Sequence, residues 1–266
     1  MEEVGGRLPR EAALTPYTRH RVFALAALVI AGVPAFLLGG AYWRHGVDDG
    51  EAVARFRAAG PAAAADAPAG LPSPGVYRYQ TTGGEKVSFL DYSRAYTPVT
   101  HRIVTRRGCG IREEQLFLVQ HVEYYDRCGD QLVGYGTDIA FWWTHGTQDF
   151  TCTGGSFDGV AVKPGEPMKW ECHDEDTRAA QTTEYVGDED VEVDGRAIPA
   201  RHTRWTTVFD GATKGAAVVD DWFDKETGLV LRETRNIGLR VGSPFIGDIA
   251  YLDVSEYKLL STTPDR

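Results

Sequence analysis

The chain has 266 residues and a formal net charge of −10 at neutral pH, with 42% hydrophobic and 11% aromatic residues. This apolar content is too high for a disordered chain, and the length suffices for one large domain or two small ones. The first 43 residues carry four arginines and three glutamates, so the negative charge is concentrated after them. Such a surface repels phosphate backbones. We therefore expect no nucleic-acid binding, whereas a basic protein partner would fit the charge.

Residues 22–43 contain no charged side chain, and about 20 helical residues cross a hydrocarbon core of about 30 Å. The segment is therefore predicted to be a transmembrane helix that anchors the protein in the cell membrane as a single-pass protein. Arg19 and Arg21 precede it, which places residues 1–21 in the cytoplasm as a short tail. A cleaved signal peptide and a buried helix of a soluble protein are the alternatives. Signal peptides usually have a shorter apolar region followed by small residues, but Tyr42 and Trp43 stand at this boundary.

Residues 44–73 are rich in Ala, Pro and Gly, which is typical of a linker. Within them, residues 49–60 are predicted to form a short helix that Asp49 caps and Gly60 ends. The Pro- and Ala-rich remainder is expected to be extended and mobile. The linker would hold the following domain near the bilayer.

Residues 74–266 are predicted to form an extracytoplasmic, mainly β domain. They contain no convincing amphipathic helix, but many runs of Val, Tyr, Trp, Thr and Phe are separated by Gly, Asp and Pro. The predicted strands cover residues 76–82, 101–107, 115–125, 131–143, 168–172, 181–186, 200–209, 216–223, 229–235 and 249–260. Their regular spacing predicts an antiparallel meander, with turns at Asp194-Gly195, Asp210-Gly211 and residues 225–228.

Several predicted strands are apolar on both faces. In residues 116–125, for example, Leu116 and Leu118 alternate with Phe117 and Val119. A strongly curved antiparallel sheet explains this pattern, because its concave face encloses a core or cavity while loops or a partner cover the convex face. The predicted fold class is therefore mainly β, as a half-barrel or open barrel. The sheet would either close on itself or be covered by loops such as residues 144–167.

The hairpin predicted around residues 220–232 reads DDWFDKETGLVLR and contains the pattern Trp-x-Asp-x-x-Thr-Gly-Leu. This pattern resembles a hairpin of the LolA- and LppX-like lipoprotein carriers, a superfamily of curved half-barrels. The pieces GVYRYQTTGGEKVS and SPFIGDIAYLDVSEYKLLS resemble membrane-anchored proteins of high-GC Gram-positive bacteria, over about residues 74–260. The carrier resemblance implies an acyl chain held inside the curved sheet, behind helices that plug its opening. The sequence shows no clear plug helix.

The four cysteines, Cys109, Cys128, Cys152 and Cys172, all lie in the predicted extracytoplasmic domain. An even number is consistent with two disulfides in an oxidising compartment. A zinc site is the alternative, but no C-x-x-C or H-x-x-x-H pairing accompanies them. Of the three possible connectivities we expect the sequential one, because neighbouring strands usually pair.

Aromatic side chains are the candidate pocket residues of the domain. Such residues could line an apolar cavity or simply fill the core. The candidates are Phe141, Trp143, Trp170, Trp205 and Trp222.

Polar groups suggest no reaction. His173 and the acidic residues 174–176 are interpreted as a solvated turn rather than a metal site. Ser156 lacks the G-x-S-x-G context of a hydrolase nucleophile. We therefore expect no cofactor, no metal and no enzymatic activity.

Three functional hypotheses remain. The first is an envelope domain that binds a lipid, a lipoprotein or another apolar ligand. The second is an interaction or scaffold module whose acidic surface engages a basic partner. The third is an enzyme of an unrecognised type. A cavity of about 300 Å³ or more would favour the first over a fully packed interior, and convergent titratable groups in a cleft would favour the third.

Overall fold

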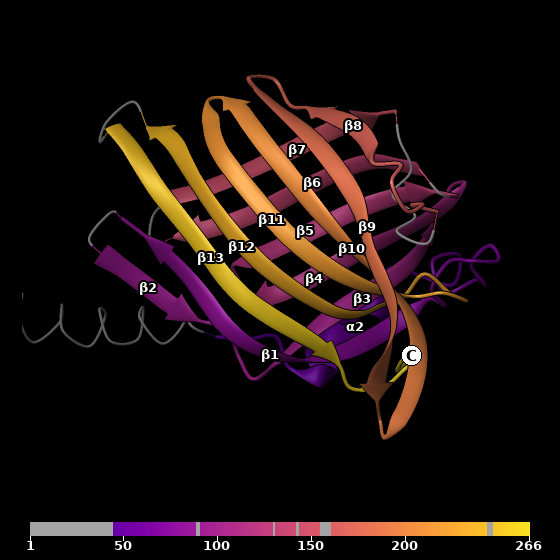
Figure 1. The fold of residues 1–266 in the computed structure, drawn as a ribbon. Helices are drawn as coiled ribbons and strands as arrows, with labels where there is room; N and C mark the ends of the chain where they lie inside the picture. Colours follow the sequence, from indigo (N-terminus) through magenta and orange to yellow (C-terminus); the bar gives the residue numbers. More distant parts are fainter. Residues whose placement is uncertain (1–44, 89–90, 130, 142–143, 155–160, 244–246) are drawn as a thin grey trace, which may run out of the picture. The chain divides into compact units, whose positions relative to one another are not determined.

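The computed structural model describes residues 45–88, 91–129, 131–141, 144–154, 161–243 and 247–266 (Figure 1). The predicted tail (residues 1–21) and transmembrane helix (residues 22–43) lie outside these residues. Within the described ranges, no helix combines the length and hydropathy needed to cross a bilayer.

The described residues form one helix and thirteen strands. The helix is α2 (Asp49–Ala58). The strands are β1 (Gly75–Val87), β2 (Tyr92–Ala95), β3 (Val99–Arg107), β4 (Gly110–Leu118), β5 (His121–Cys128), β6 (Gln131–Phe141), β7 (Thr144–Thr153), β8 (Met168–His173), β9 (Thr177–Val193), β10 (Arg196–Gly211), β11 (Thr213–Asp224), β12 (Val230–Ser243) and β13 (Gly247–Leu259).

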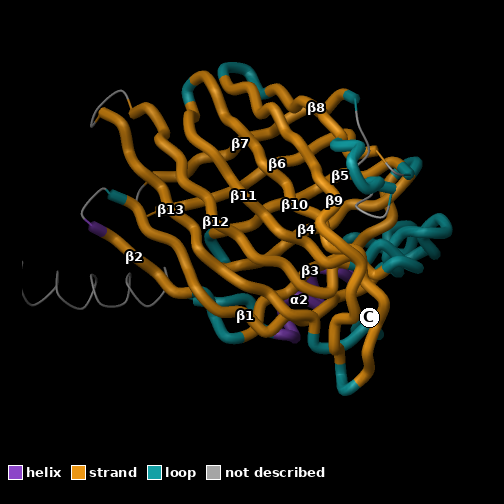
Figure 2. The backbone as a smooth tube through the Cα atoms, viewed as in Figure 1, coloured by secondary structure: helices purple, strands orange, loops and turns teal. Residues whose placement is uncertain are grey.

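Twelve of these strands form a closed antiparallel barrel. Neighbours in sequence pair from β3 to β13, and β1 joins β3 to β13. Strands β9–β13 cross in front of β4–β7 as the two walls of the barrel (Figures 1 and 2). The prediction of a mainly β antiparallel sheet is confirmed. The predicted half-barrel or open barrel is wrong, because the last strand pairs with the first.

Closure depends on β1, which is long enough to bind different partners along its length. Residues 75–80 pair with β3, residues 79–87 pair with β13, and residues 84–87 also pair with β2. Gly83 and Gly84 lie where these partners meet. A Cβ on Gly83 would lie 2.1 Å from the carbonyl oxygen of Val254, and one on Gly84 would lie 2.3 Å from that of Arg94. Glycine therefore permits the close approach of both neighbouring strands.

Local turn chemistry fixes two predicted hairpins. Asp194 and Gly195 have φ angles of 51° and 71° and connect β9 to β10, which is the conformation expected for an Asp-Gly two-residue turn. In the β11–β12 turn, the carboxylate of Asp224 accepts hydrogen bonds from the amide of Glu226 at 2.9 Å and from the hydroxyl of Thr227 at 2.6 Å. The Trp-x-Asp-x-x-Thr-Gly-Leu pattern is thus a side-chain-stabilised hairpin turn.

Residues 144–153 form strand β7, although the sequence predicted a covering loop over residues 144–167. Their sequence, THGTQDFTCT, contains four Thr and one Phe, which favour a strand, but His145, Gly146, Gln148 and Asp149 interrupt them. Every backbone position from Thr144 to Thr151 nevertheless pairs with β6. Pairing with β6 therefore continues through the residues of low β-propensity.

Helix α2 covers part of the outer barrel wall within the segment predicted as a linker. It begins after Asp48, whose side chain accepts a hydrogen bond from the amide of Glu51 at 2.8 Å. The N-cap is therefore Asp48, one residue before the predicted cap at Asp49. Ala52 and Phe56 are buried in a cluster with Val76, Ile103 and Leu116 of β1, β3 and β4.

The remaining linker residues pack at one end of the barrel. Leu71 is buried in the same cluster as Val193 and Leu229, and Ala67 packs against that cluster. The hydroxyl of Tyr77 also donates a hydrogen bond to the carbonyl of Ser73 at 2.8 Å. Residues 60–73 thereby cover the end of the barrel that carries the β9–β10 and β11–β12 turns. We call this stretch the end cap.

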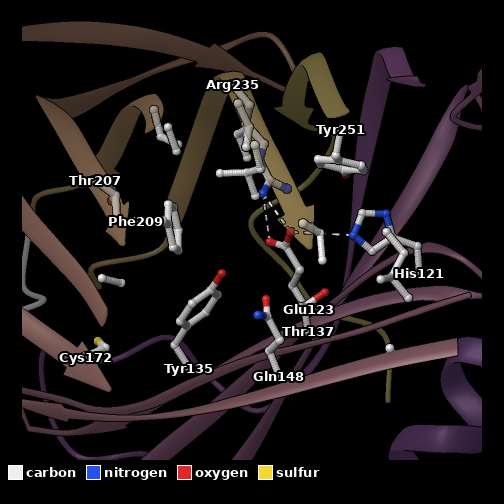
Figure 3. Close-up of a pocket in the computed structure, with 18 of the residues that line it drawn as sticks. His121, Glu123, Tyr135, Thr137, Gln148, Cys172, Thr207, Phe209, Arg235 and Tyr251 are labelled. Atoms are coloured by element: carbon white, nitrogen blue, oxygen red, sulfur yellow. Dashed lines mark hydrogen bonds and ion pairs between the residues drawn. The ribbon is translucent and has the colours of Figure 1, made fainter. Parts of the chain in front are cut away.

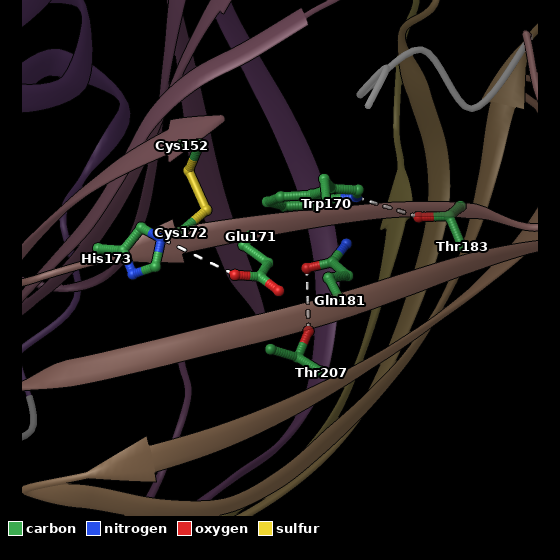
Figure 4. Close-up of a disulfide and its surroundings, with 8 residues drawn as sticks. All are labelled: Cys152, Trp170, Glu171, Cys172, His173, Gln181, Thr183 and Thr207. Atoms are coloured by element: carbon green, nitrogen blue, oxygen red, sulfur yellow. Dashed lines mark hydrogen bonds and ion pairs between the residues drawn. A yellow bond between two sulfur atoms is a disulfide. The ribbon is translucent and has the colours of Figure 1, made fainter. Parts of the chain in front are cut away.

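Two disulfides join Cys109 to Cys128 and Cys152 to Cys172. The predicted sequential pairing is confirmed. The second disulfide connects directly paired residues of β7 and β8 (Figure 4). The β7–β8 ladder contains only three residue pairs, so this bridge lies at the shortest contact between neighbouring strands of the described barrel.

Candidate functional site: an internal cavity with a charged floor

A cavity of about 400 Å³ lies inside the barrel, towards the end opposite the end cap. Strands β5–β13 and the last residue of β1 contribute its lining, together with Tyr92 of β2. Near the hairpin that joins β12 to β13, the lining includes Val241, which is 39% exposed, and Gly242. This volume lies within the range of small-molecule sites.

Apolar side chains from alternate strand positions form the cavity wall. The indole rings of Trp170 and Trp205 meet edge to face at 6.2 Å, and Trp205 stacks with Phe223 at 6.4 Å. Ile237 and Leu239 of β12 complete this side. An apolar ligand in the cavity could therefore contact aromatic rings and branched side chains along this wall.

Charged residues form the floor of the cavity, where it meets the middle of the barrel. Glu123 of β5 lies between Arg235 of β12 and His121 (Figure 3). One guanidinium nitrogen of Arg235, Nη2, donates to both carboxylate oxygens of Glu123 at 2.8 and 2.9 Å. The Nδ1 atom of His121 lies 3.2 Å from the carboxylate of Glu85. All these side chains are almost completely buried.

The floor groups hold one another in their charged forms. Burial alone would lower the pKa of His121, but the carboxylates of Glu85 and Glu123 outweigh it and raise this pKa to about 9. Burial would likewise raise the pKa of Glu123, whereas Arg235 and His121 lower it to about 2. At neutral pH the floor therefore presents an imidazolium, a carboxylate and a guanidinium.

Further ion pairs fill the interior between this floor and the end cap. Arg102 of β3 donates to Glu233 of β12 at 2.8 Å, and Arg127 of β5 donates to Glu113 of β4 at 2.8 Å. The Arg102–Glu233 and Arg235–Glu123 pairs each join strands that are not neighbours in the barrel. These ion pairs and the end cap occupy the interior up to the floor, so the cavity lies towards the other end of the barrel.

The structure brings two of the five predicted pocket residues, Trp170 and Trp205, into the cavity lining. Trp222 lies apart from it, stacked on His202 with ring centroids 4.0 Å apart. The side chain of Phe141 and the whole of Trp143 lie outside the described residues. Figure 4 shows Trp170 beside the Cys152–Cys172 disulfide, with its indole N–H directed at the hydroxyl of Thr183.

The charged residues of the floor were not among the predicted pocket residues, which are all aromatic. The sequence of strand β12 indicates such a floor. Glu233 and Arg235 follow the same every-second-residue spacing as Leu231, Ile237 and Leu239. A period of two places all five side chains on one face of the strand. Charges at inward positions between core residues therefore predict a polar site inside the barrel.

The fold and the site define the class of protein as a closed antiparallel β-barrel with an internal cavity of ligand size. No protein-family model matches the chain, and no curated protein matches its sequence. Among solved structures, the chain is similar to the hypothetical lipoprotein YmcC from Escherichia coli. The identity is 12%, the match covers 82% of this chain and 92% of that chain, and the TM-score is 0.38. A similarity at this level carries no inference about function.

Proposed function

We propose that the barrel binds a small apolar or amphiphilic ligand, such as a lipid or the acyl chain of a lipoprotein, in its internal cavity. The observation that carries the proposal is a cavity of about 400 Å³ with walls built mainly from apolar side chains. Such a space, with a few polar groups at one side, is typical of sites that bind small molecules. The role is binding rather than catalysis.

We further propose that residues 22–43 anchor the protein in the cell membrane and that the barrel lies outside the cytoplasm. The uncharged sequence of this segment supports the anchor, and the two disulfides support an oxidising location for the barrel. The cavity would then take its ligand from the cell envelope.

Photo-crosslinking of the full chain in membranes of expressing cells tests the binding proposal. The probe is a medium-chain alkyl alcohol that carries a diazirine, and its adducts are mapped to residues by mass spectrometry. We expect adducts on cavity-lining residues such as Trp205, Ile237 and Leu239. Mapping by residue distinguishes the cavity from probe that has only partitioned into the bilayer.

A matched pair of variants on β11 supplies the control. Ala217 lines the cavity and Ala216 is exposed on the outer wall. Ala217→Phe should fill the cavity and reduce labelling of its lining at least tenfold, whereas Ala216→Phe should leave labelling unchanged. Equal labelling in both variants, or adducts restricted to the outside of the barrel, would contradict a ligand cavity. That result would favour the scaffold role with a basic protein partner.

A further inference from the structure

Arg235 at the cavity floor retains hydrogen-bonding capacity that its neighbours do not use. Its side chain is buried and lines the cavity. The Nη2 atom donates to Glu123, but Nε and Nη1 have no hydrogen-bond partner among the described residues. The nearest carboxylate oxygens to Nε, from Glu233 and Asp253, are each 3.7 Å away. A guanidinium donates only, so these groups require an acceptor.

The carboxylates around Arg235 are already engaged with other groups. Glu123 also accepts a hydrogen bond from the hydroxyl of Tyr125 at 3.1 Å. Asp253 accepts hydrogen bonds from Ser255 at 2.7 Å and Tyr96 at 3.1 Å. Burial raises the pKa of Asp253, which favours its neutral form. The surrounding acids therefore leave part of the positive charge of Arg235 uncompensated.

The ionisable groups of the cavity lining likewise carry more positive than negative charge. His121 and Arg235 are cationic at neutral pH, and Glu123 is the anion between them. Glu85, which lies next to His121 outside the lining, is paired with Arg94 and leaves this balance unchanged. Exposed His145 also lines the cavity, with its Nε2 atom 2.7 Å from Asp138. The floor can accordingly accept one further negative charge, provided that this charge receives direct hydrogen bonds.

Apolar wall lies immediately next to these donors. Val219 of β11 is the cross-strand neighbour of Arg235, and Ile237 is the next inward residue along β12. Both line the cavity with Arg235. A ligand whose head contacts Arg235 would therefore have its body in contact with apolar side chains.

We propose that the cavity selects an amphiphile with an anionic, acceptor-only head, a carboxylate or a phosphate, which Arg235 binds through Nε and Nη1 while the apolar tail lies along the wall. This inference rests on the proposed ligand-binding function and names the ligand class of that same cavity. A charge-assisted hydrogen bond from a guanidinium is roughly twice as strong as a neutral one. A ligand with an anionic head should therefore bind more tightly than a ligand with an uncharged head and a tail of equal length.

Three diazirine probes with the same alkyl tail test the head group, again with the full chain in membranes. One probe ends in a carboxylate, one in a phosphate monoester and one in an alcohol. We expect at least one anionic probe to label the cavity lining at a tenfold or greater lower concentration than the alcohol. The carboxylate and phosphate arms also distinguish a fatty acid from a phosphate-headed lipid.

A pair of variants on β11 isolates the role of charge inside the cavity. Val219→Glu places a carboxylate beside Arg235 across the β11–β12 ladder, whereas Val218→Glu adds the same charge at the adjacent residue, which does not line the cavity. In Val219→Glu the preference for anionic probes should disappear. Val218→Glu should retain the preference. Both variants preserve the Arg235–Glu123 pair, which Arg235→Gln would break.

The outcomes separate this inference from the function on which it rests. Absence of cavity labelling by all three probes would remove the ligand-binding function itself. Equal labelling by the alcohol and the anionic probes would retain binding and overturn the selection of an anionic head. Identical behaviour of Val219→Glu and Val218→Glu would also overturn it.

Discussion

The interior of the barrel holds more charged side chains than is usual for a protein interior. A buried ion pair is often no more stabilising than apolar residues of similar volume, because both ions lose their hydration. Stability alone therefore does not explain pairs such as Arg235–Glu123 and Arg102–Glu233. Their clearest consequence is chemical, because they give an otherwise apolar cavity a polar floor.

His121 predicts how stability depends on pH. Its pKa is about 9 in the folded protein and about 6.5 in an unfolded chain. Protonated His121 therefore contributes fully to the free energy of unfolding below about pH 6.5, and this contribution disappears as the pH rises through about 9. It amounts to on the order of 3 kcal/mol.

Thermal unfolding of His121→Gln measures this contribution. Between about pH 6 and pH 10, the Tm of the variant should fall less steeply than that of the unmodified chain, because glutamine does not titrate. His173→Gln, at an exposed position at the end of β8, should keep the original slope. Parallel Tm curves for His121→Gln and the unmodified chain would show that His121 does not titrate in this range.

Among the elements, strands β7 and β8 form the weakest seam of the barrel. Three residue pairs join them, compared with seven for β4 and β5. One disulfide joins β7 to β8, and the other joins Cys128 of β5 to Cys109 in the turn just before β4, with sequence separations of 20 and 19 residues. The chain-entropy model gives both bridges about 3 kcal/mol of stabilisation, so a difference between them must come from the local ladders.

Replacing both cysteines of a bridge by alanine should reveal that difference. Cys152→Ala with Cys172→Ala should accelerate hydrogen exchange in β7 and β8 well before global unfolding. Cys109→Ala with Cys128→Ala should lower the Tm with little local change in β4 and β5. Equal exchange patterns in both double variants would exclude a specific role of the bridge in the β7–β8 seam.

Helix α2 depends on its contact with the outer wall, since an isolated helix of this length is unstable in water. Phe56 is 3% exposed and is the larger of the two buried side chains of the helix. Phe56→Ala should lower the free energy of unfolding by about 3 kcal/mol, whereas Ala54→Gly at an exposed site inside the helix should cost about 1 kcal/mol. Chemical denaturation monitored by circular dichroism compares the two. Equal losses would mean that packing of α2 contributes little.

For the whole molecule, the proposed topology predicts opposite fates for the two chain ends. With an epitope tag at each end, protease added to intact cells stripped of their wall should remove the C-terminal tag and spare the N-terminal one. The protein should also remain in the membrane after an alkaline wash. A mature chain that begins beyond Trp43 would instead identify the leading segment as a signal peptide.

The sequence predicted those features that depend on neighbouring residues. The Asp194-Gly195 turn, the β11–β12 hairpin and most strands follow from local chemistry and alternation. The disulfide pairing also followed, because Cys152 and Cys172 lie on adjacent strands and Cys109 directly precedes β4, the neighbour of the strand that carries Cys128. Strand β7 was missed because Gly146, Gln148 and Asp149 interrupt its Thr and Phe residues, and pairing with β6 continues the strand through them.

Barrel closure and the cavity floor depend on residues far apart in the chain. Tyr79 pairs with Leu259, and Arg235 meets Glu123 across the interior. Alternation shows that Glu233 and Arg235 face inward, but it does not show which residues of the opposite wall face them. The ion pairs across the interior could therefore be identified only from the three-dimensional structure.

The pairing of β1 with β13 has a consequence for how the protein acquires its fold. The wall of the barrel stays open until the last strand has been synthesised and, in the proposed topology, translocated. Contacts of such long sequence separation form slowly, and an unpaired β1 is exposed meanwhile to association with other chains. Because Tyr251 of β13 lines the cavity, a nascent chain that stops before this strand has no complete binding site.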